Sequence, residues 1–247
     1  MKLNALINMK DEGQIVYNKD DSVLEEVLSP FLYKKQPFST KTKDVLYSID
    51  NNNIIGPSDD KILEVDELGI PGEHNLQNFL AASTCSHLMG ISQNQIVRTL
   101  KEFKGIEHRL EYVRTINEVE YINDSKATNI NSVIVAINTY DQPIILILGG
   151  LNKGANFRLL LPHIKSSHVR DIVSYGDAGG QINTALGDAV RSVQVTDLSS
   201  AVKKAQLMAA PGDIVLLSPG CASYDEFSNF EERGNHFKSI IKNIAIS

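Results

Sequence analysis

The heptapeptide Asn-Asp-Ser-Lys-Ala-Thr-Asn at residues 123–129 is the stretch of this chain that decides both its fold and its candidate site. It follows an apolar, strand-like run at residues 119–122 and precedes a helical pattern of apolar residues that begins at Val133. A strand that delivers polar residues to a helix N-terminus forms an anion site, because free N–H groups and the helix dipole favour phosphate or carboxylate. Lys126 adds positive charge, and Asp124 can accept hydrogen bonds from ribose hydroxyls or neutralise a cation. The same residue types also cap ordinary helices, so the heptapeptide alone leaves both interpretations open.

Two further apolar runs end in a similar way. Residues 144–148 are a continuous apolar run of the kind found in buried parallel strands, and Gly-Gly-Leu-Asn-Lys-Gly follows at 149–154. Residues 214–217 are also apolar and lead to Ser-Pro-Gly-Cys-Ala-Ser-Tyr-Asp at 218–225. Ligands of open α/β sheets bind at the carboxyl ends of the strands. These three strand ends together therefore predict a site for anionic ligands.

The pattern of expected elements changes near residue 105. Before it, short strands are expected at residues 14–17, 45–49, 53–55 and 61–65, with helices at 76–89 and 92–100. After it, strands alternate with helices such as the one expected at 199–210; the expected strands are 111–115, 119–122, 144–148, 171–174, 192–195 and 214–217. This alternation predicts an α/β fold with a Rossmann-like, mostly parallel, doubly wound sheet in the C-terminal part.

Composition excludes several classes of protein. The chain has 247 residues, a net charge of −6 and a pI near 5.5, which argues against bulk nucleic-acid binding. No apolar run approaches the roughly 18 residues of a membrane span, so membrane insertion is not expected. The two cysteines, Cys85 and Cys221, are far apart, which disfavours a disulfide or a cysteine metal framework, and Cys221 is expected to be a packing residue. The N-terminus lacks a signal-peptide core, so we expect a cytoplasmic protein.

Six ordered motifs resemble those of the muramyl ligases. They are Gly-Glu-His-Asn-x-x-Asn from residue 72, His-Arg-x-Glu from 108, the heptapeptide from 123, Gly-Gly-x-x-Lys-Gly from 149, Leu-Ser-Pro-x-Cys-Ala-Ser-x-Asp-x-Phe from 217 and Asn-Phe-Glu-x-Arg-Gly-x-x-Phe from 229. The resemblance is strongest to the members that add D-glutamate, and it covers the second half of such an enzyme. It implies that residues 1–105 are the remnant of a central ATP-binding domain and that residues 106–247 are the C-terminal domain.

The resemblance implies an ATP-dependent amide-bond ligase of peptidoglycan precursor synthesis. In such an enzyme ATP phosphorylates the carboxylate of UDP-N-acetylmuramoyl-L-alanine, and the amine of D-glutamate attacks the acyl phosphate, so that ADP and phosphate are released. The enzyme must hold two anionic substrates and a triphosphate together. Cations and directed N–H groups are therefore expected to contribute most to catalysis, together with positioning of the substrates. The implied cofactors are ATP and Mg²⁺, the implied partners are the two substrates, and the implied state is a monomer.

By the same resemblance, individual residues receive roles. Nucleotide binding is assigned to His74, Asn75, Asn78, Arg109 and Asp124. D-glutamate binding is assigned to Thr128, Lys153, Ser223 and Phe230, and the catalytic cations are Lys126 and Lys153. Phe230 would act through its backbone, since a benzyl group cannot hydrogen-bond a carboxylate. A capped helix N-terminus is the competing interpretation for His74 and Asn75, and a surface cation is the one for Arg109.

One motif of such ligases is missing. They need a phosphate-binding loop of the type Gly-x-x-Gly-Lys-[Ser/Thr], and this sequence has no Gly-Lys dipeptide. The family order would place that loop, the uridine-binding domain and the Glu and His that hold Mg²⁺ before residue 1, so we expect the chain alone to be inactive. Spacing from Asn-Lys-Asp-Asp at 18–21 matches Lys2 to the lysine that is carbamylated in this family, where it becomes a carboxylate-like metal ligand. A solvated Lys2 is the alternative.

Three rival functions remain. The first is a related ligase that adds glutamate to a folate or adds a different amino acid to the muramoyl peptide. The second is a non-catalytic fragment that retains affinity for adenine or glutamate, which the missing phosphate loop favours. The third is a nicotinamide-dependent oxidoreductase. Its only support is Gly-Asp-Ala-Gly-Gly at residues 176–180, which lacks the required Gly-x-Gly-x-x-Gly spacing.

Overall fold

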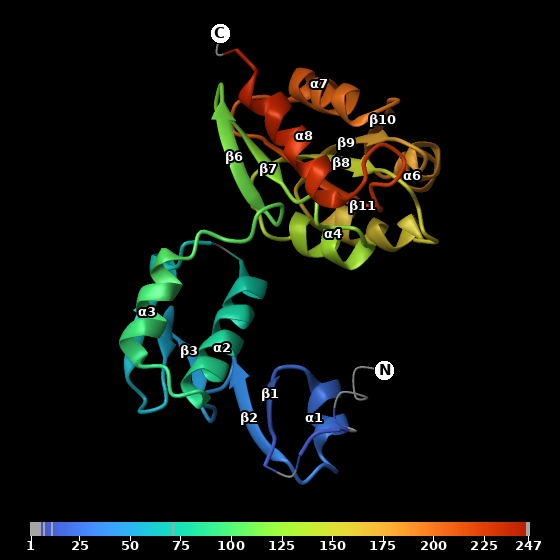
Figure 1. Cartoon of the computed structure of the whole chain (residues 1–247). Coiled ribbons are helices and arrows are strands. Elements are labelled where there is room, and N and C mark those ends of the chain that lie inside the picture. Colours follow the sequence, from blue (N-terminus) through green and yellow to red (C-terminus); the bar gives the residue numbers. More distant parts are fainter. Residues whose placement is uncertain (1–5, 7, 11, 71, 246–247) are drawn as a thin grey trace. The chain divides into compact units, whose positions relative to one another are not determined.

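The structure is a computed structural model that describes residues 6, 8–10, 12–70 and 72–245. It divides into two compact units, residues 1–104 and residues 105–247. Each unit has its own sheet (Figure 1). Each unit also has its own apolar core. The assignment of the first unit to a central ATP-binding domain stays a prediction.

The first unit is built on a five-stranded sheet in the order β1-β2-β3-β4-β5. The strands are β1 (Gln14–Asn18), β2 (Lys34–Ser39), β3 (Tyr47–Asp50), β4 (Asn53–Ile55) and β5 (Lys61–Glu64). The first three are parallel neighbours, whereas β4 and β5 each pair antiparallel to the strand before. The helices are α1 (Ser22–Leu28), η2 (Val65–Glu67), α2 (Glu73–Leu88) and α3 (Gln93–Glu102). The sequence did not predict α1 or β2.

The second unit is built on a six-stranded sheet in the order β10-β9-β8-β11-β7-β6. The strands are β6 (Glu111–Ile116), β7 (Val119–Asn123), β8 (Ile144–Gly149), β9 (Val169–Tyr175), β10 (Arg191–Gln194) and β11 (Ile214–Gly220). All neighbours are parallel except β6 and β7, which form an antiparallel pair. This confirms the predicted mostly parallel sheet.

Helices cover both faces of this sheet. The first face packs against α4 (Ile130–Ile137), η3 (Phe157–Leu160), α5 (Leu161–Ser166) and α6 (Gly179–Leu186). The second face packs against α7 (Leu198–Met208) and α8 (Phe230–Lys242). Along β8, Ile144 and Leu146 face the first cluster while Ile145 and Ile147 face the second, and all four are fully buried. The run is continuously apolar because both faces of a doubly wound sheet are covered.

Chain crossings bring three strand ends together at the middle of the sheet. The chain leaves β7, passes over the position of β11 to form β8, continues to β9 and β10, and returns to insert β11 between β7 and β8. The carboxyl ends of β7, β11 and β8 are therefore neighbours, which is the place where ligands of such sheets bind. No helix in the described part of the chain is long and apolar enough to cross a membrane.

Candidate functional site

The loops after β7, β8 and β11 are joined by backbone hydrogen bonds. Asp124 N–H donates to the Leu217 carbonyl at 2.8 Å, and Gly220 N–H donates to the Ala127 carbonyl at 2.8 Å. Leu151 and Ala222 exchange a reciprocal pair of bonds at 2.9 and 3.1 Å. The three polar segments that the sequence singled out thus form one continuous edge.

Two exposed lysines lie on this edge, each near an aromatic ring. The Lys126 Nζ lies 5.5 Å from the centre of the Phe230 ring, and the Lys153 Nζ lies 4.6 Å from the centre of the Tyr224 ring. A ring face attracts an ammonium without using its N–H donors, so both groups remain able to bind an anion. Thr128 is exposed in the Lys126 loop, and Ser223 is buried beside Tyr224. The predicted D-glutamate residues therefore come from the three joined loops and the start of α8.

Asp124 is 5% exposed and already holds two protein donors. Ser218 Oγ donates to Oδ2 at 2.8 Å, and Leu110 N–H donates to Oδ1 at 3.3 Å. Burial raises the pKa of the Asp124 carboxyl to about 7, although both hydrogen bonds and the charge of Arg109 act in the opposite direction. Each carboxylate oxygen has two lone pairs, so a ribose hydroxyl can still be accepted alongside these donors.

His108 was quoted in a motif, but the sequence gave it no role of its own. It is 3% exposed, and its Nδ1 lies 3.0 Å from Asn123 Nδ2, which also donates to Glu111 Oε2 at 2.9 Å. Because an amide nitrogen only donates, His108 Nδ1 accepts and the neutral ring carries its proton on Nε2. Burial, together with the charge of Lys238, lowers the pKa of His108. The His108 ring is therefore neutral and is held in place by Asn123, the last residue of β7.

Close approach of α8 to His108 requires a glycine. A Cβ placed on Gly234 would lie 2.2 Å from His108 Nδ1, so no side chain fits at that position. The preceding residue, Arg233, is fully buried and donates to the Ser125 backbone and hydroxyl and to the Cys221 carbonyl. Sequence reasoning gave Arg233 no role, because nothing in a helical pattern separates a buried arginine from a solvated one.

One group in the described ranges collects three possible metal-ligand atoms, namely Glu107, His108 and Glu111. The Lys238 ammonium, however, hydrogen-bonds both glutamates, at 3.0 Å in the case of Glu111. That ammonium supplies the positive charge a metal ion would bring, so the group is a structural ion-pair cluster. Lys2, the predicted metal residue, lies outside the described residues.

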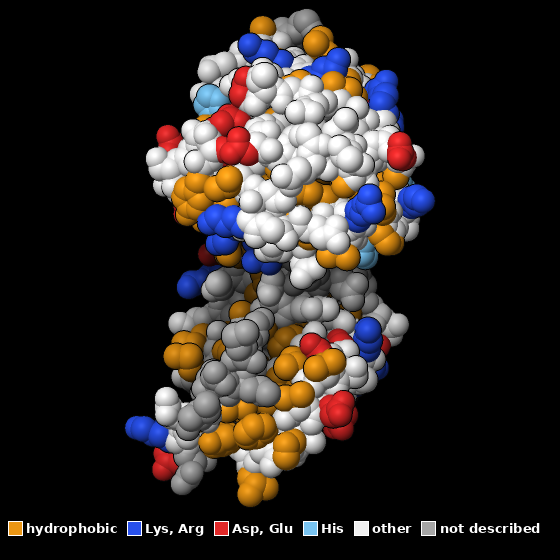
Figure 2. Space-filling model, turned by 90° about the vertical axis from the view of Figure 1, so that its right-hand side faces the viewer, with side chains coloured by type: hydrophobic (Ala, Val, Ile, Leu, Met, Phe, Trp, Pro, Cys, Tyr) orange, Lys and Arg blue, Asp and Glu red, His pale blue; other side chains and the backbone are white. Residues whose placement is uncertain are grey.

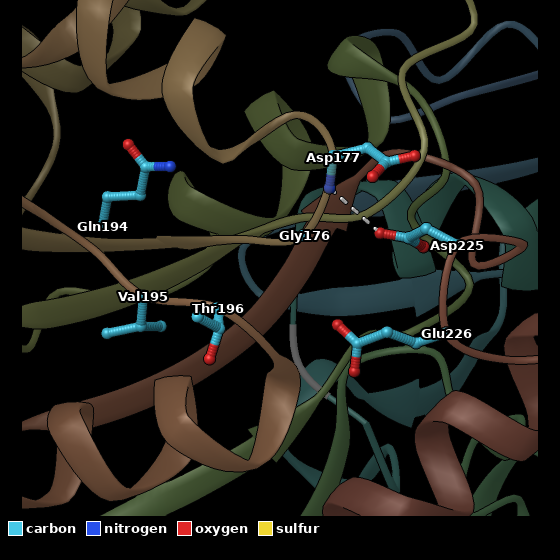
Figure 3. Close-up of a pocket in the computed structure, with 7 residues that line it drawn as sticks. All are labelled: Gly176, Asp177, Gln194, Val195, Thr196, Asp225 and Glu226. Carbon is cyan, nitrogen blue, oxygen red and sulfur yellow. Dashed lines mark hydrogen bonds between the residues drawn. The ribbon is translucent and has the colours of Figure 1, made fainter.

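An open pocket of about 510 Å³ lies beside this edge, at the ends of β9 and β10 (Figure 3). It is lined by Gly176, Asp177, Gln194, Val195, Thr196, Asp225 and Glu226. Asp225 Oδ2 accepts a hydrogen bond from Asp177 N–H at 3.3 Å, which ties the loop after β11 to the loop after β9. Three carboxylates and no basic side chain line the pocket, so it disfavours anions. The predicted anion site and this pocket are therefore different places.

The predicted nucleotide residues are divided between the two units. Arg109 is exposed and Asp124 is buried, and both belong to the second unit. In the first unit, Asn75 is buried and Asn78 is exposed on α2; the side chain of His74 lies outside what the structure describes. Among the described residues of the second unit that Figure 2 draws, basic side chains lie in separate groups.

Comparison with known proteins identifies the class. Residues 108–221 match the family described as Mur ligase, glutamate ligase domain. The second unit, with its doubly wound sheet and its basic strand-end loops, therefore belongs to the Mur ligase family.

The curated relatives that the chain matches share one name. The chain is 41% identical over 248 residues to the UDP-N-acetylmuramoylalanine–D-glutamate ligase of Clostridioides difficile (strain 630), covering 98% of this chain and 55% of the relative. It is 39% identical over 240 residues to the ligase of that name from Bacillus mycoides (strain KBAB4), covering 96% of this chain and 52% of the relative. The chain thus spans about half the length of the curated relatives it matches.

Solved structures share the fold at low identity. The MurF ligase from Thermotoga maritima in complex with ADP matches with a TM-score of 0.66 and 13% identity, over 99% of this chain and 57% of that one. Folylpolyglutamate synthase from Thermotoga maritima matches with a TM-score of 0.62 and 16% identity, over 97% of this chain and 56% of that one. At these identities the likeness establishes the fold alone.

Proposed function

We propose that this protein takes part in joining D-glutamate to UDP-N-acetylmuramoyl-L-alanine, an ATP-dependent step of peptidoglycan precursor synthesis. The main observation in support of this proposal is that Lys126, Lys153 and Ser223 lie on three loops that the sheet topology brings together at one edge. The similarity to D-glutamate ligases supports the choice of substrate. Cytoplasmic location and a monomeric state belong to the same proposal.

The D-glutamate carboxylates would be held by Lys153 and Ser223. An ammonium and a hydroxyl can each donate to a carboxylate oxygen, and the ammonium bond is charge-assisted. Phe230 begins α8, so its backbone N–H lies at the positive end of the helix dipole, where a second carboxylate is stabilised. Thr128 would add a hydroxyl from the loop after β7. These contacts orient the amine of D-glutamate for attack.

Lys126 would stabilise the negative charge that develops on the acyl phosphate during that attack. Arg109 would bind ATP phosphates and Asp124 the ribose, while His74, Asn75 and Asn78 would lie against the adenine. Mg²⁺, when bound, neutralises phosphate charge, and we propose carbamylated Lys2 as a ligand for it. We also propose that this chain alone does not turn over ATP, because it has no Gly-Lys dipeptide from which to build a phosphate loop.

Calorimetric titration of the chain with D-glutamate tests the proposal. Lys153→Ala is expected to weaken binding at least tenfold, and L-glutamate is expected to compete poorly. Lys165→Ala is the matched control, because Lys165 is an exposed lysine on α5, shortly before β9 begins and hence toward the opposite edge of the sheet. Binding that is equal in wild type and Lys153→Ala would contradict the assigned site.

A second measurement addresses turnover. Phosphate release from ATP is followed with UDP-N-acetylmuramoyl-L-alanine and D-glutamate present, and no turnover is expected from this chain alone. Turnover that disappears in Lys153→Ala would mean that the chain builds a phosphate site without the standard loop, and the proposed incompleteness would then be wrong.

A further inference from the structure

Arg233 is a fully buried cation that forms no ion pair with a described carboxylate, although its charge acts at longer range on the carboxyl of Glu226. It is 0% exposed, and in the described part of the chain no Asp or Glu oxygen lies within ion-pair distance of its guanidinium. The guanidinium donates to three neutral oxygens, one hydroxyl and two backbone carbonyls. Burying a charge costs several kcal/mol unless it is fully compensated, and an apolar side chain of similar size is often more stabilising. Fold stability alone therefore does not account for an arginine here.

The guanidinium joins the segments that form the edge. Nε donates to Ser125 Oγ at 3.0 Å and Nη2 donates to the Ser125 carbonyl at 2.8 Å, which fixes the loop after β7. Nη1 donates to the Cys221 carbonyl at 3.1 Å, which fixes the loop after β11. Nη1 also lies against the loop after β8, since a Cβ on Gly150 would come within 3.1 Å of it.

Ser125 closes this network. Its hydroxyl accepts from Arg233 Nε and donates to the Phe230 carbonyl at 2.8 Å. The first residue of α8 is thereby tied to the loop after β7, and the guanidinium one turn further along the helix is tied to that loop as well. Three neutral oxygens and a rigid planar fork thus set the spacing of four chain segments.

Each of these segments carries a residue proposed to bind D-glutamate. Thr128 lies three residues after Ser125, Lys153 lies three residues after Gly150, and Ser223 lies two residues after Cys221. Phe230 begins the helix that carries Arg233. A displacement of the guanidinium would therefore be felt at all four proposed contacts, although Arg233 itself is inaccessible to any ligand.

We propose that Arg233 is a positioning residue that sets the spacing of the D-glutamate-binding loops, an inference that rests on the function proposed above. It acts through its fork geometry and not through its charge alone. Lysine carries the same charge on a compact head, so it can replace at most part of the fork. Arg233→Lys should accordingly keep the fold while releasing the loops.

Hydrogen exchange and D-glutamate titration on the whole chain test this inference. In Arg233→Lys, amides of residues 125–128 and 221–223 are expected to exchange at least tenfold faster, and D-glutamate affinity is expected to fall at least tenfold. Arg170→Lys is the matched control, since Arg170 hydrogen-bonds Asp171, Asp213 and the Met208 carbonyl at the amino edge of the same sheet. It is expected to leave both readouts unchanged.

Ser125→Ala provides a second variant if Arg233→Lys does not fold. It removes only the hydroxyl between Arg233 Nε and the Phe230 carbonyl, so several-fold faster exchange is expected at the start of α8 together with weaker D-glutamate binding. Ser132→Ala, in the first turn of α4, is its control.

The outcomes separate cleanly. Unchanged exchange in the loops, or a rise spread evenly over the unit with D-glutamate affinity retained, would overturn the positioning role and leave Arg233 merely structural. Failure of the wild-type chain to bind D-glutamate would sink the proposed function instead. In that case the exchange data alone still decide whether Arg233 holds the loops.

Discussion

Replacing Asp124 by Asn should change how the stability of the second unit depends on pH. The Asp124 carboxyl is 5% exposed, and burial raises its pKa from 3.8 to about 7 in the folded chain. Asn has almost the same shape, and its side-chain oxygen can still accept from Leu110 N–H. The variant therefore removes the titration with little change in packing.

The sign and size of the effect follow from linkage. Because the folded state holds the proton more tightly, unfolding releases it between pH 3.8 and about 7. The stabilisation is complete below the unfolded pKa and is lost as the pH rises through the folded one. A difference of this size corresponds to about 4 kcal/mol of unfolding free energy. At pH values well above 7, the Asp124 carboxyl is ionised in both states, and its titration no longer changes the free energy of unfolding.

Urea unfolding of wild type and Asp124→Asn at pH 4 and pH 7.5 measures this quantity. The variant is expected to gain about 4 kcal/mol relative to wild type between the two pH values. Carbon-13 NMR of the Asp124 carboxyl provides a direct check, with a midpoint expected near 7. A pH-independent difference, or a midpoint below about 5, would refute the reasoning that desolvation dominates at this residue.

Three further variants test other parts of the structure by urea unfolding. Burial acts to raise the pKa of Asp171, but hydrogen bonds from Arg191 and Arg170 outweigh it and lower the pKa. Asp171→Asn should therefore cost about 1–3 kcal/mol at pH 7 and progressively less as the pH falls below about 4. Gly149→Ala should cost at least about 2 kcal/mol, since its φ is 153° and a Cβ would lie 2.3 Å from the Tyr175 carbonyl oxygen. Its control, Gly154→Ala, has φ 91° but open space around it, and should cost about 1 kcal/mol. Leu146→Ala empties a fully buried position and should cost about 2–5 kcal/mol.

The sequence predicted most of the second unit, because strands that are buried on both faces appear in the sequence as continuous apolar runs. The expected strands at 119–122, 144–148 and 214–217 are confirmed within the observed β7, β8 and β11. In the first unit, β2 was missed because Lys-Lys-Gln-Pro-Phe-Ser lacks an apolar alternation and contains a proline. Pairing with β1 on one side and β3 on the other makes it a strand all the same.

The candidate site was only partly visible in the sequence. Lys126 and Lys153 could be predicted as site residues, because each is a lysine that follows an apolar, strand-like run. The sequence did not indicate that Asn123 holds a neutral His108 ring or that Arg233 is buried. The contacts responsible join residues 15 and 108 positions apart in the sequence. Roles for the predicted site residues remain predictions until the titrations above are made.

Sequence alone determined the main strands and helices of the second unit and the chemistry of the loops between them, because strand and helix preferences, turns and charges act among near neighbours. Tertiary structure alone decided the order β10-β9-β8-β11-β7-β6, which inserts the last strand between two earlier ones. It also decided that Arg233 donates to Ser125 and Cys221 and not to water. Such choices depend on how whole faces pack and on which distant groups satisfy a buried donor, and no local pattern encodes them.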